Sequence, residues 1–398
     1  MLRPGTFALT ALLAGLSAFG PLTTDMYLSS MPDIARSLSA TPAQVQFTIS
    51  AYLIGLAFGQ IVYGPVSDRF GRKPVLLGAL AIYSLAGLAC ALAASIDLLV
   101  AARVFQALGA SGLLVITRAV VRDLYTGARA GRELSLIASV MALGPVLAPA
   151  FGGVLQEAFG WRSVFLALLA IGLIGATVVS LLLPETLRQR ANEFSLMSML
   201  RSFGVLLRHP AYVAYLSLAT FSYAGLIVWI TSAAFVLQDL YGLTPFRFGV
   251  VFAMGALGYM SGATFAARMV TRVGLDGIIG LGSGALVTGG LGMLAALAFR
   301  PTSAFVLVLA VAVYIAGLGM ILAQSIAGSL SPFPERAGAA SSLFGFVQQS
   351  VAAGAGVLIA WLMGDSTWPV AIMVATMGGV TFALWLATRS IRHKAVKF

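Results

Sequence analysis

Two ionisable side chains stand inside otherwise apolar stretches of this 398-residue chain. Asp25 lies in an apolar run that begins near residue 7, and Arg103 lies in another that begins near residue 98. Charged groups at membrane depth are costly and mark functional sites by default. Burial disfavours the carboxylate form of an acid, whereas a guanidinium keeps its proton. The chemistry we expect at Asp25 is therefore proton exchange, and we expect Arg103 to find a partner in another side chain, in water or in an anionic group of a substrate.

A structural role is the alternative for each of these residues. Asp25 could cap a helix that bends after Pro21 near the outer interface. Arg103 could extend its side chain to the outer face from a helix that begins near Asp97. Asp25 nevertheless is the single acid that the sequence places inside an apolar run, which favours the functional interpretation.

The elements that must position these residues are membrane helices. The chain is 60% hydrophobic and 9% charged, whereas soluble proteins carry about 25% charged residues. Runs of about 20 apolar residues can cross the hydrocarbon core as helices, which satisfy their own backbone polar groups. We expect an all-α membrane protein with twelve transmembrane helices, near residues 7–31, 43–64, 75–94, 98–118, 133–157, 161–183, 211–238, 247–267, 277–298, 302–324, 338–362 and 367–388.

Composition and charge exclude several classes of protein. The single cysteine, Cys90, rules out a disulfide framework and a cysteine-based metal site. No phosphate-binding loop or nucleophile constellation is present, so we expect no enzyme, no cofactor and no metal. The net charge of +11 comes mostly from basic residues in alternate loops. That bias places both termini in the cytoplasm and removes the reason to expect a nucleic-acid partner.

The longest polar interruption falls midway along the chain. We predict an N-terminal six-helix bundle over residues 1–187, a cytoplasmic linker over 188–208 and a C-terminal six-helix bundle over 209–398. The segment 271–274 after the eighth run echoes the segment 68–71 after the second. An offset of about half the chain is typical of two parallel repeats that rock about a central site.

The stretch Gly64–Pro74 supplies a specific motif between the second and third runs. It resembles the signature loop of the major facilitator superfamily, G-x-x-x-D-R-x-G-R-[RK]. The matching residues are Gly64, Asp68, Arg69, Gly71, Arg72 and Lys73. The resemblance implies that this loop forms a conformational latch on the cytoplasmic side, with Asp68 and Arg69 as its expected centre.

Three further motifs resemble the bicyclomycin- and chloramphenicol-resistance branch of the drug:proton antiporters. Residues 24–28 resemble its D-M-Y-L-P segment, with Ser29 in place of the proline. Arg103, Gln106 and Gly109 match a second signature, R-x-x-Q-x-x-G, whose arginine modulates protonation of the acid in the first helix. The fifth run resembles an antiporter motif that kinks and packs closely, through Gly144, Pro145, Pro149, Gly152 and Gly153.

The substrate is expected to meet aromatic and amide side chains. The candidates are Asp25, Tyr27, Gln106, Tyr223, Gln324, Gln348 and Gln349. Aromatic walls with few polar groups suit a permissive pocket, and amides facing lipid would be costly. Aromatic side chains on membrane helices also commonly face lipid or its interfaces.

The sequence thus predicts a proton-coupled exporter of drug-like compounds, working as a monomer by alternating access in the bacterial inner membrane. The alternative is a proton-coupled exporter or symporter of one polar metabolite, such as a sugar or an amino acid. A site dedicated to a polar substrate would be expected to show more embedded polar groups than one acid and one arginine.

Overall fold

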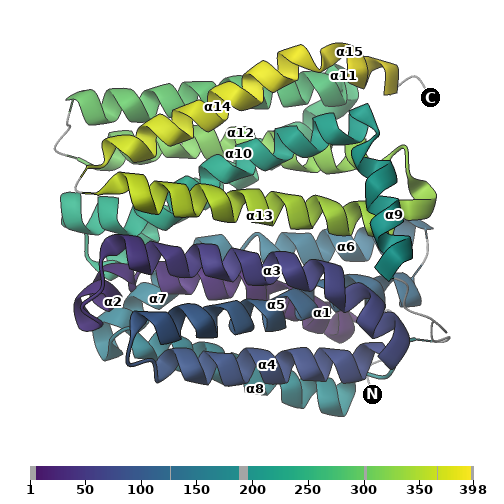
Figure 1. Ribbon diagram of the computed structural model, residues 1–398, viewed down its shortest axis with the longest axis horizontal. Helices are drawn as coiled ribbons and strands as arrows, with labels where there is room; N and C mark the ends of the chain where they lie inside the picture. Colours follow the sequence, from purple (N-terminus) through teal and green to yellow (C-terminus); the bar gives the residue numbers. More distant parts are fainter. Residues whose placement is uncertain (1–5, 126, 188–195, 300–302, 365, 396–398) are drawn as a thin grey trace. The chain divides into compact units, whose positions relative to one another are not determined.

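The structure is a computed structural model that describes residues 6–125, 127–187, 196–299, 303–364 and 366–395, and within these ranges it is helical and contains no strand (Figure 1). The expected all-α membrane fold is confirmed. Eleven helical stretches in the described ranges are long and apolar enough to cross a membrane. One of them, α11 (Pro245–Phe299), contains Gly274 with φ 78° and ψ 164°. Because that residue interrupts the helix, α11 comprises two of the predicted spans.

The chain divides into two compact units. The first contains residues Met1–Phe194 and Pro245–Gly249, and the second contains Ser195–Thr244 and Val250–Phe398. The helices of the first unit are α1 (Phe7–Leu28), α2 (Met31–Ser37), α3 (Pro42–Phe70), α4 (Arg72–Ala91), α5 (Ile96–Leu124), α6 (Gly127–Met141), α7 (Gly144–Phe159) and α8 (Arg162–Leu182). Within it, α5 packs between α3 and α4, α4 packs on α8, and α1 packs on α7, α6 and α5.

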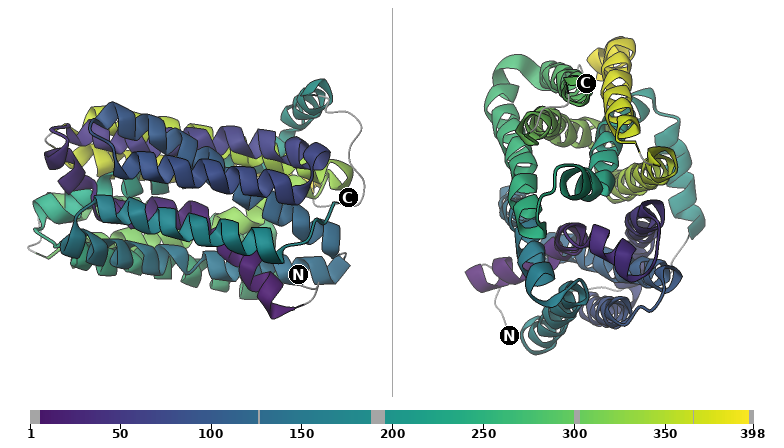
Figure 2. Two further views of the ribbon diagram at one scale, coloured as in Figure 1. Left: turned by 90° about the horizontal axis from the view of Figure 1, so that it is seen from below. Right: turned by 90° about the vertical axis from the view of Figure 1, so that its left-hand side faces the viewer.

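The second unit is built around α10 (Pro210–Ala234), which packs against α12, α13 and α14. A short π-helix, Phe235–Leu240, continues α10. The remaining elements are α9 (Leu196–Leu207), most of α11, α12 (Phe305–Leu330), the 3-10 turn Pro334–Arg336, α13 (Ala337–Met363), α14 (Trp368–Ala387) and α15 (Arg389–Ala395). The right-hand view of Figure 2 shows several of these helices nearly end on.

The predicted linker, 188–208, falls partly outside the described residues, which resume at residue 196. Its second part is α9, an amphipathic helix that packs on α10 and α13. Among its residues from 199 onward, Phe203 and Leu206 are buried, while Leu200, Val205 and Leu207 are exposed. This segment is therefore a packed element of the second unit.

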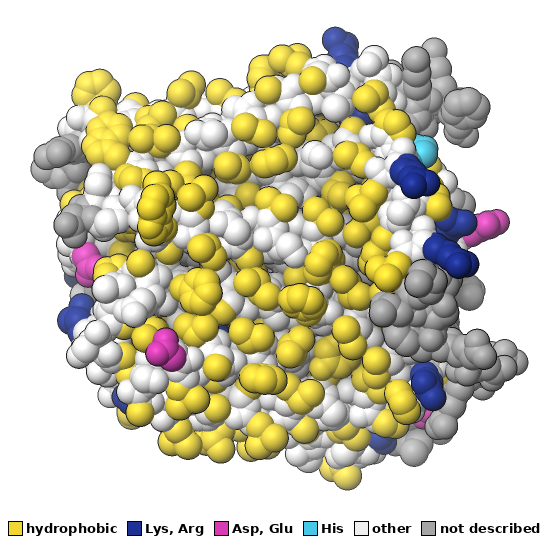
Figure 3. All heavy atoms as spheres, in the orientation of Figure 1, with side chains coloured by type: hydrophobic (Ala, Val, Ile, Leu, Met, Phe, Trp, Pro, Cys, Tyr) yellow, Lys and Arg dark blue, Asp and Glu magenta, His cyan; other side chains and the backbone are white. Residues whose placement is uncertain are grey.

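The surface of the helices is suited to hydrocarbon. Large apolar side chains such as Phe58, Leu85, Phe151, Leu181 and Trp361 are exposed. On the face shown in Figure 3, hydrophobic side chains cover the middle of the helices, and Lys and Arg side chains gather toward their ends. Soluble proteins rarely expose apolar area on this scale, so the molecule is a multi-pass membrane protein.

The predicted loop Gly64–Pro74 is mostly helical, which corrects the sequence interpretation. α3 continues through Pro65 to Phe70, and α4 begins at Arg72. Gly71 alone joins them, with φ 102°, a backbone conformation that glycine adopts without the steric penalty of a side chain. The polar sequence reflects helix ends that leave the membrane, and the chain reverses at one residue.

A buried ion pair closes the second unit near its C-terminal end. Arg392 of α15 is fully buried, and its Nε donates to Asp276 Oδ1 at 2.6 Å. Arg392 Nη2 donates to the Trp385 carbonyl at 2.7 Å, and Trp385 Nε1 donates to the Asp276 carbonyl at 3.2 Å. The pair thus joins α15 and the end of α14 to the second half of α11.

Removing one partner of this pair should be strongly destabilising. We expect Asp276→Asn to lower the free energy of unfolding by about 3 kcal/mol, because Arg392 is left buried without a countercharge. The matched control is Arg36→Gln, which breaks the Arg36–Asp33 pair, whose side chains are 68% and 35% exposed. That change should cost less than about 1 kcal/mol. Equal effects in detergent-based unfolding measurements would contradict the prediction.

Candidate functional site

Asp25 lies three residues before the end of α1, in the part of the helix that follows Pro21. Only 5% of its surface is exposed. Within the described part of the chain, its carboxyl group makes no hydrogen bond and no ion pair. Asp25 is therefore a buried acid without a countercharge among the described residues.

Arg103 of α5 is fully buried beside α1 and α3. Its guanidinium carbon lies 4.2 Å from the centroid of the Tyr52 ring and 4.7 Å from that of the Tyr27 ring. The Phe165 ring of α8 is 6.0 Å away. We refer to Tyr27 and Tyr52 as the tyrosine cage. Aromatic faces attract a guanidinium electrostatically, and more strongly when water is excluded.

The remaining contacts of Arg103 are with neutral acceptors. Nη1 donates to Gln106 Oε1 at 2.9 Å and to the Thr23 carbonyl at 3.4 Å. Nε and Nη2 are buried and make no hydrogen bond within the described residues. No ion pair joins Arg103 to Asp25 within the described residues: Arg103 contacts Thr23 and Tyr27 of α1, on the face of that helix opposite Asp25.

Close helix packing fixes this arrangement. A Cβ atom on Gly55 of α3 would lie 2.5 Å from the Val104 carbonyl of α5. A Cβ atom on Gly109 of α5 would lie 2.6 Å from the backbone nitrogen of Tyr83 on α4. Small residues permit such approach of membrane helices, and here they bring Arg103 against the Tyr52 ring.

Two residues expected to contact substrate belong to this buried cluster. Tyr27 is fully buried, and its hydroxyl lies 2.7 Å from that of Thr48. Gln106 is also fully buried, and its Oε1 accepts a hydrogen bond from Arg103. In this structure both side chains surround Arg103 and neither is open to a ligand.

The antiporter motif is divided between two helices. The predicted span 133–157 is interrupted after Met141, and α7 restarts at Gly144 with Pro145 in its first turn. Proline favours such a first position and disfavours helix in the residue before it. Gly144, Ala148, Pro149, Gly152 and Gly153 are all buried.

The buried face of α7 lies against the Asp25 segment of α1. A Cβ atom on Gly152 would collide with the Met26 carbonyl, and one on Gly144 would lie 3.4 Å from Pro21. Ser29, which stands where the related segment has proline, donates through its hydroxyl to the Pro149 carbonyl at 2.7 Å. The motif therefore supports the helix that carries Asp25.

The signature residues form an ion-pair cluster whose centre is Arg72. Its Nη1 lies 2.5 Å from Asp68, and its Nε donates to Asp123 of α5 at 2.8 Å. Glu185 accepts backbone N–H groups of Arg72 and Lys73 at 3.0 and 3.2 Å. Arg69, expected at the centre with Asp68, places its guanidinium 5.3 Å from the Phe70 ring.

The sequence interpretation missed a second buried acid. The predicted span 133–157 begins at Glu133, yet α6 begins at Gly127 and leaves Glu133 only 8% exposed. Its Oε2 accepts a hydrogen bond from the Thr10 hydroxyl of α1 at 2.6 Å. The helical pattern of 127–141 could have revealed it, had the span been started six residues earlier.

The remaining substrate candidates lie in the second unit. Tyr223 is on α10, Gln324 on α12, and Gln348 and Gln349 on α13. All four are half-buried. Gln348 Nε2 and Gln349 Oε1 are buried and make no hydrogen bond within the described residues, so they can bond to a ligand or to water.

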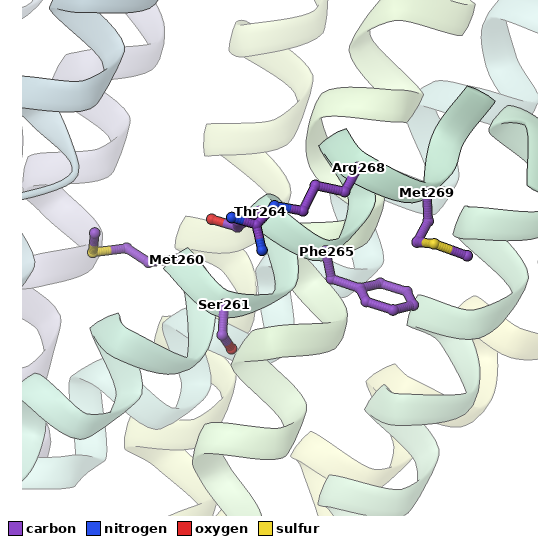
Figure 4. A pocket seen from close by; sticks show the side chains of 6 residues that line it. All are labelled: Met260, Ser261, Thr264, Phe265, Arg268 and Met269. Atoms are coloured by element: carbon purple, nitrogen blue, oxygen red, sulfur yellow. The ribbon is translucent and has the colours of Figure 1, made fainter. Parts of the chain in front are cut away.

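An open pocket of about 430 Å³ lies along one face of α11 (Figure 4). Its lining residues recur at helical spacing: Met260, Ser261, Thr264, Phe265, Arg268 and Met269. The size is in the range of small-molecule sites. Figure 4 shows the Arg268 side chain running back along the helix toward Thr264. None of these residues was selected from the sequence, although the stripe of methionine and hydroxyl side chains was visible there.

Comparison with known proteins gives consistent matches. The sequence profile described as "Major Facilitator Superfamily" matches residues 8–357. The chain is 33% identical to the uncharacterized MFS-type transporter YdgK of Bacillus subtilis, over 85% of each chain. It is 30% identical to a bicyclomycin resistance protein homolog of Haemophilus influenzae, over 99% of this chain and 98% of that one. It is 28% identical to multidrug resistance protein D of Escherichia coli, over 98% of each.

Solved structures match in fold. A crystal structure of the nucleoside transporter NupG has a TM-score of 0.77 at 13% identity, covering 96% of this chain and 99% of that chain. At this identity the likeness concerns the fold alone.

The α1–α7 contact can be tested by adding a side chain. We expect Gly152→Leu to lower the free energy of unfolding by about 1–3 kcal/mol, because the added atoms force α7 away from the Met26 carbonyl. The control is Gly131→Leu on α6, where a Cβ atom meets nothing within 4 Å. The prediction is wrong if the two variants unfold at the same denaturant concentration.

Proposed function

The chain belongs to the Major Facilitator Superfamily, a family of transporters, and from this premise we propose that it exports drug-like small molecules in exchange for protons. The observation that carries the proposal is Asp25, a buried acid on α1 without an ion-pair partner in the described residues. Relatives named for bicyclomycin and multidrug resistance support the choice of drug-like substrates.

Proton exchange at Asp25 provides the coupling. Asp25 takes up a proton when it faces the outside and releases it when it faces the cytoplasm, where the carboxylate form favours drug binding. One group then serves two ligands in turn, so that neither crosses without the other. Arg103 adjusts the proton affinity of Asp25 from within the same unit.

Substrate contacts in the second unit come from α11 and α13. The α11 pocket combines apolar and hydroxyl side chains, and methionine adapts to ligands of different shape. Gln348 and Gln349 supply a donor and an acceptor without other partners in the described residues. Tyr223 and Gln324 remain further candidates on α10 and α12. A site of this composition suits permissive binding better than recognition of one polar metabolite.

The distribution of basic residues and the family support a proposal for the membrane location and orientation of the protein. We place the protein in the inner membrane of a bacterium, with both termini in the cytoplasm, and propose that it works as a monomer. Residues 1–187 and 209–398 are proposed as the two bundles that rock against each other. The Arg72 cluster, with Gly64, Asp68, Arg69, Gly71 and Lys73 around it, forms the cytoplasmic latch.

The decisive test compares proton movement in proteoliposomes that hold an acidic interior. Bicyclomycin, chloramphenicol and other drugs are added outside while an internal dye reports pH. We expect wild type to lose the gradient on drug addition and Asp25→Asn to match protein-free liposomes. Glu133→Gln is the matched control, a second buried acid on α6, and should retain the response.

Several outcomes would contradict the assignment. A normal response from Asp25→Asn would remove its coupling role and turn attention to Glu133 or Asp33. A response to sugars or amino acids but to no drug would replace drug export with transport of a polar metabolite.

A further inference from the structure

The α11 pocket contains one charged side chain, Arg268, and no acid lies near it along the helix. Residues 245–273 include no Asp or Glu. Within the described part of the chain, Arg268 and Thr264 make no hydrogen bond and no ion pair. Asp276, the next acid along α11, pairs with Arg392. Arg268 therefore brings a permanent positive charge and five N–H donors to the pocket.

The pocket lies on the face of α11 that turns away from α12. On the opposite face, a Cβ atom on Gly262 would collide with the Ala316 carbonyl of α12. Thr264 and Arg268, by contrast, are exposed. The pocket of about 430 Å³ is therefore open to a ligand without any change in the packing of α11 on α12.

The direction of the Arg268 side chain is informative. Arg268 lies shortly before Gly274, where α11 is interrupted. An arginine that only avoids hydrocarbon extends toward the polar region at the nearer helix end. Figure 4 shows the opposite direction, with the side chain running away from that end toward Thr264. The guanidinium is thus presented along the pocket.

The other lining residues separate a polar strip from an apolar one. Ser261 and Thr264 carry hydroxyl groups, and Ser261 Oγ donates to the Gly258 carbonyl at 2.7 Å. Met260, Phe265 and Met269 supply apolar surface, and methionine side chains adapt to different shapes. A ligand that matches this pocket has one anionic group and an apolar body.

We propose that the α11 pocket selects amphipathic anions, whose acidic group binds Arg268 while the apolar body lies along Met260, Phe265 and Met269. This assignment rests on the proposed function, in which the pocket contacts exported compounds, and it adds their charge class. A guanidinium binds a carboxylate through paired hydrogen bonds that are stronger than those between neutral groups. A cationic compound would meet like charge and no acid in the pocket.

A phospholipid is the other amphipathic anion that a membrane offers, and it fits less well. A volume of about 430 Å³ is in the range of drug-sized ligands, whereas a phospholipid has two long chains. Its headgroup would lie by the helix end from which Arg268 turns away (Figure 4). Its chains would cover the hydroxyl groups of Ser261 and Thr264.

The test measures binding at the pocket itself. The full-length protein carries 4-fluorophenylalanine at position 265 and is placed in nanodiscs of phosphatidylcholine, which has no net charge. Fluorine NMR follows the signal while 6-phenylhexanoate, 6-phenylhexanol or 6-phenylhexylamine is added. We expect Arg268→Gln to raise the half-saturating concentration of the carboxylate by about tenfold, the effect of one charge-assisted hydrogen bond. The value for the alcohol should not change.

Two variants separate this result from a general effect of charge. Arg268→Glu should weaken the carboxylate further and strengthen the amine. Arg272→Gln removes the arginine one turn later, which does not line the pocket, and should leave the carboxylate unaffected. An equal loss for carboxylate and alcohol in Arg268→Gln, or the same loss of carboxylate in Arg272→Gln, would overturn the proposal.

Nanodiscs that also contain phosphatidylglycerol distinguish the two sources of an anionic group. We expect the carboxylate to keep its dependence on Arg268 in them. If phosphatidylglycerol moves the fluorine signal in an Arg268-dependent way and the carboxylate does not, the pocket holds a lipid headgroup and the proposal is wrong.

The result can be separated from that of the proton assay. Asp25→Asn should retain the preference for the carboxylate, because Asp25 belongs to the other unit. Arg268-dependent binding in a protein that moves no protons with any drug would keep this site and reject the proposed export. Drug-driven proton movement without a charge preference at the pocket would reject the charge class alone.

Discussion

The energetic cost of a permanent charge in hydrocarbon is the constraint on which the first unit depends. Arg103 cannot lose its proton and is fully buried, so the surrounding helices must compensate it. They do so with two aromatic faces, one amide oxygen and one backbone carbonyl. The close contacts of Gly55 and Gly109 follow from this need, because a wider helix spacing would leave the guanidinium out of reach of the rings.

Each unit also contains a buried arginine that, unlike Arg103, forms an ion pair with a carboxylate. Arg72 and Arg392 lie near helix ends and pair directly with carboxylates, Asp68 and Asp123 in one case and Asp276 in the other. The two pairs differ in their order along the chain. In the first unit the arginine, Arg72, directly follows the glycine turn at Gly71, whereas in the second unit the acid, Asp276, follows the turn at Gly274. Arg72 and Arg392 thus pair with acids and join helix ends, whereas Arg103 is held by aromatic rings and neutral oxygens among the described residues.

The helices, the family and two of the candidate site residues could be predicted from the sequence. The apolar runs predicted the helices, and the stretch Gly64–Pro74 indicated the family. Asp25 and Arg103 were identified because charged residues are rare in apolar runs. The partners of Arg103 could not be predicted, because aromatic residues on membrane helices are common and only tertiary packing decides which ring meets a cation. Glu133 was missed because the predicted span began six residues after the start of α6. The α11 pocket was missed because a stripe of Met, Ser and Thr resembles ordinary lipid-facing sequence.

The interruption between α6 and α7 has a mechanical consequence. Gly152 lets α7 touch the backbone of α1 at Met26, and Ser29 ties the two helices through the Pro149 carbonyl. α7 and the Asp25 segment must therefore move as one rigid piece. α6, which ends at Met141, connects to α7 through Ala142 and Leu143 and also packs on α1, where Glu133 accepts the Thr10 hydroxyl. A change in the angle of α6 would therefore have to break the Thr10–Glu133 hydrogen bond near the start of α1, far along the helix from the Asp25 segment.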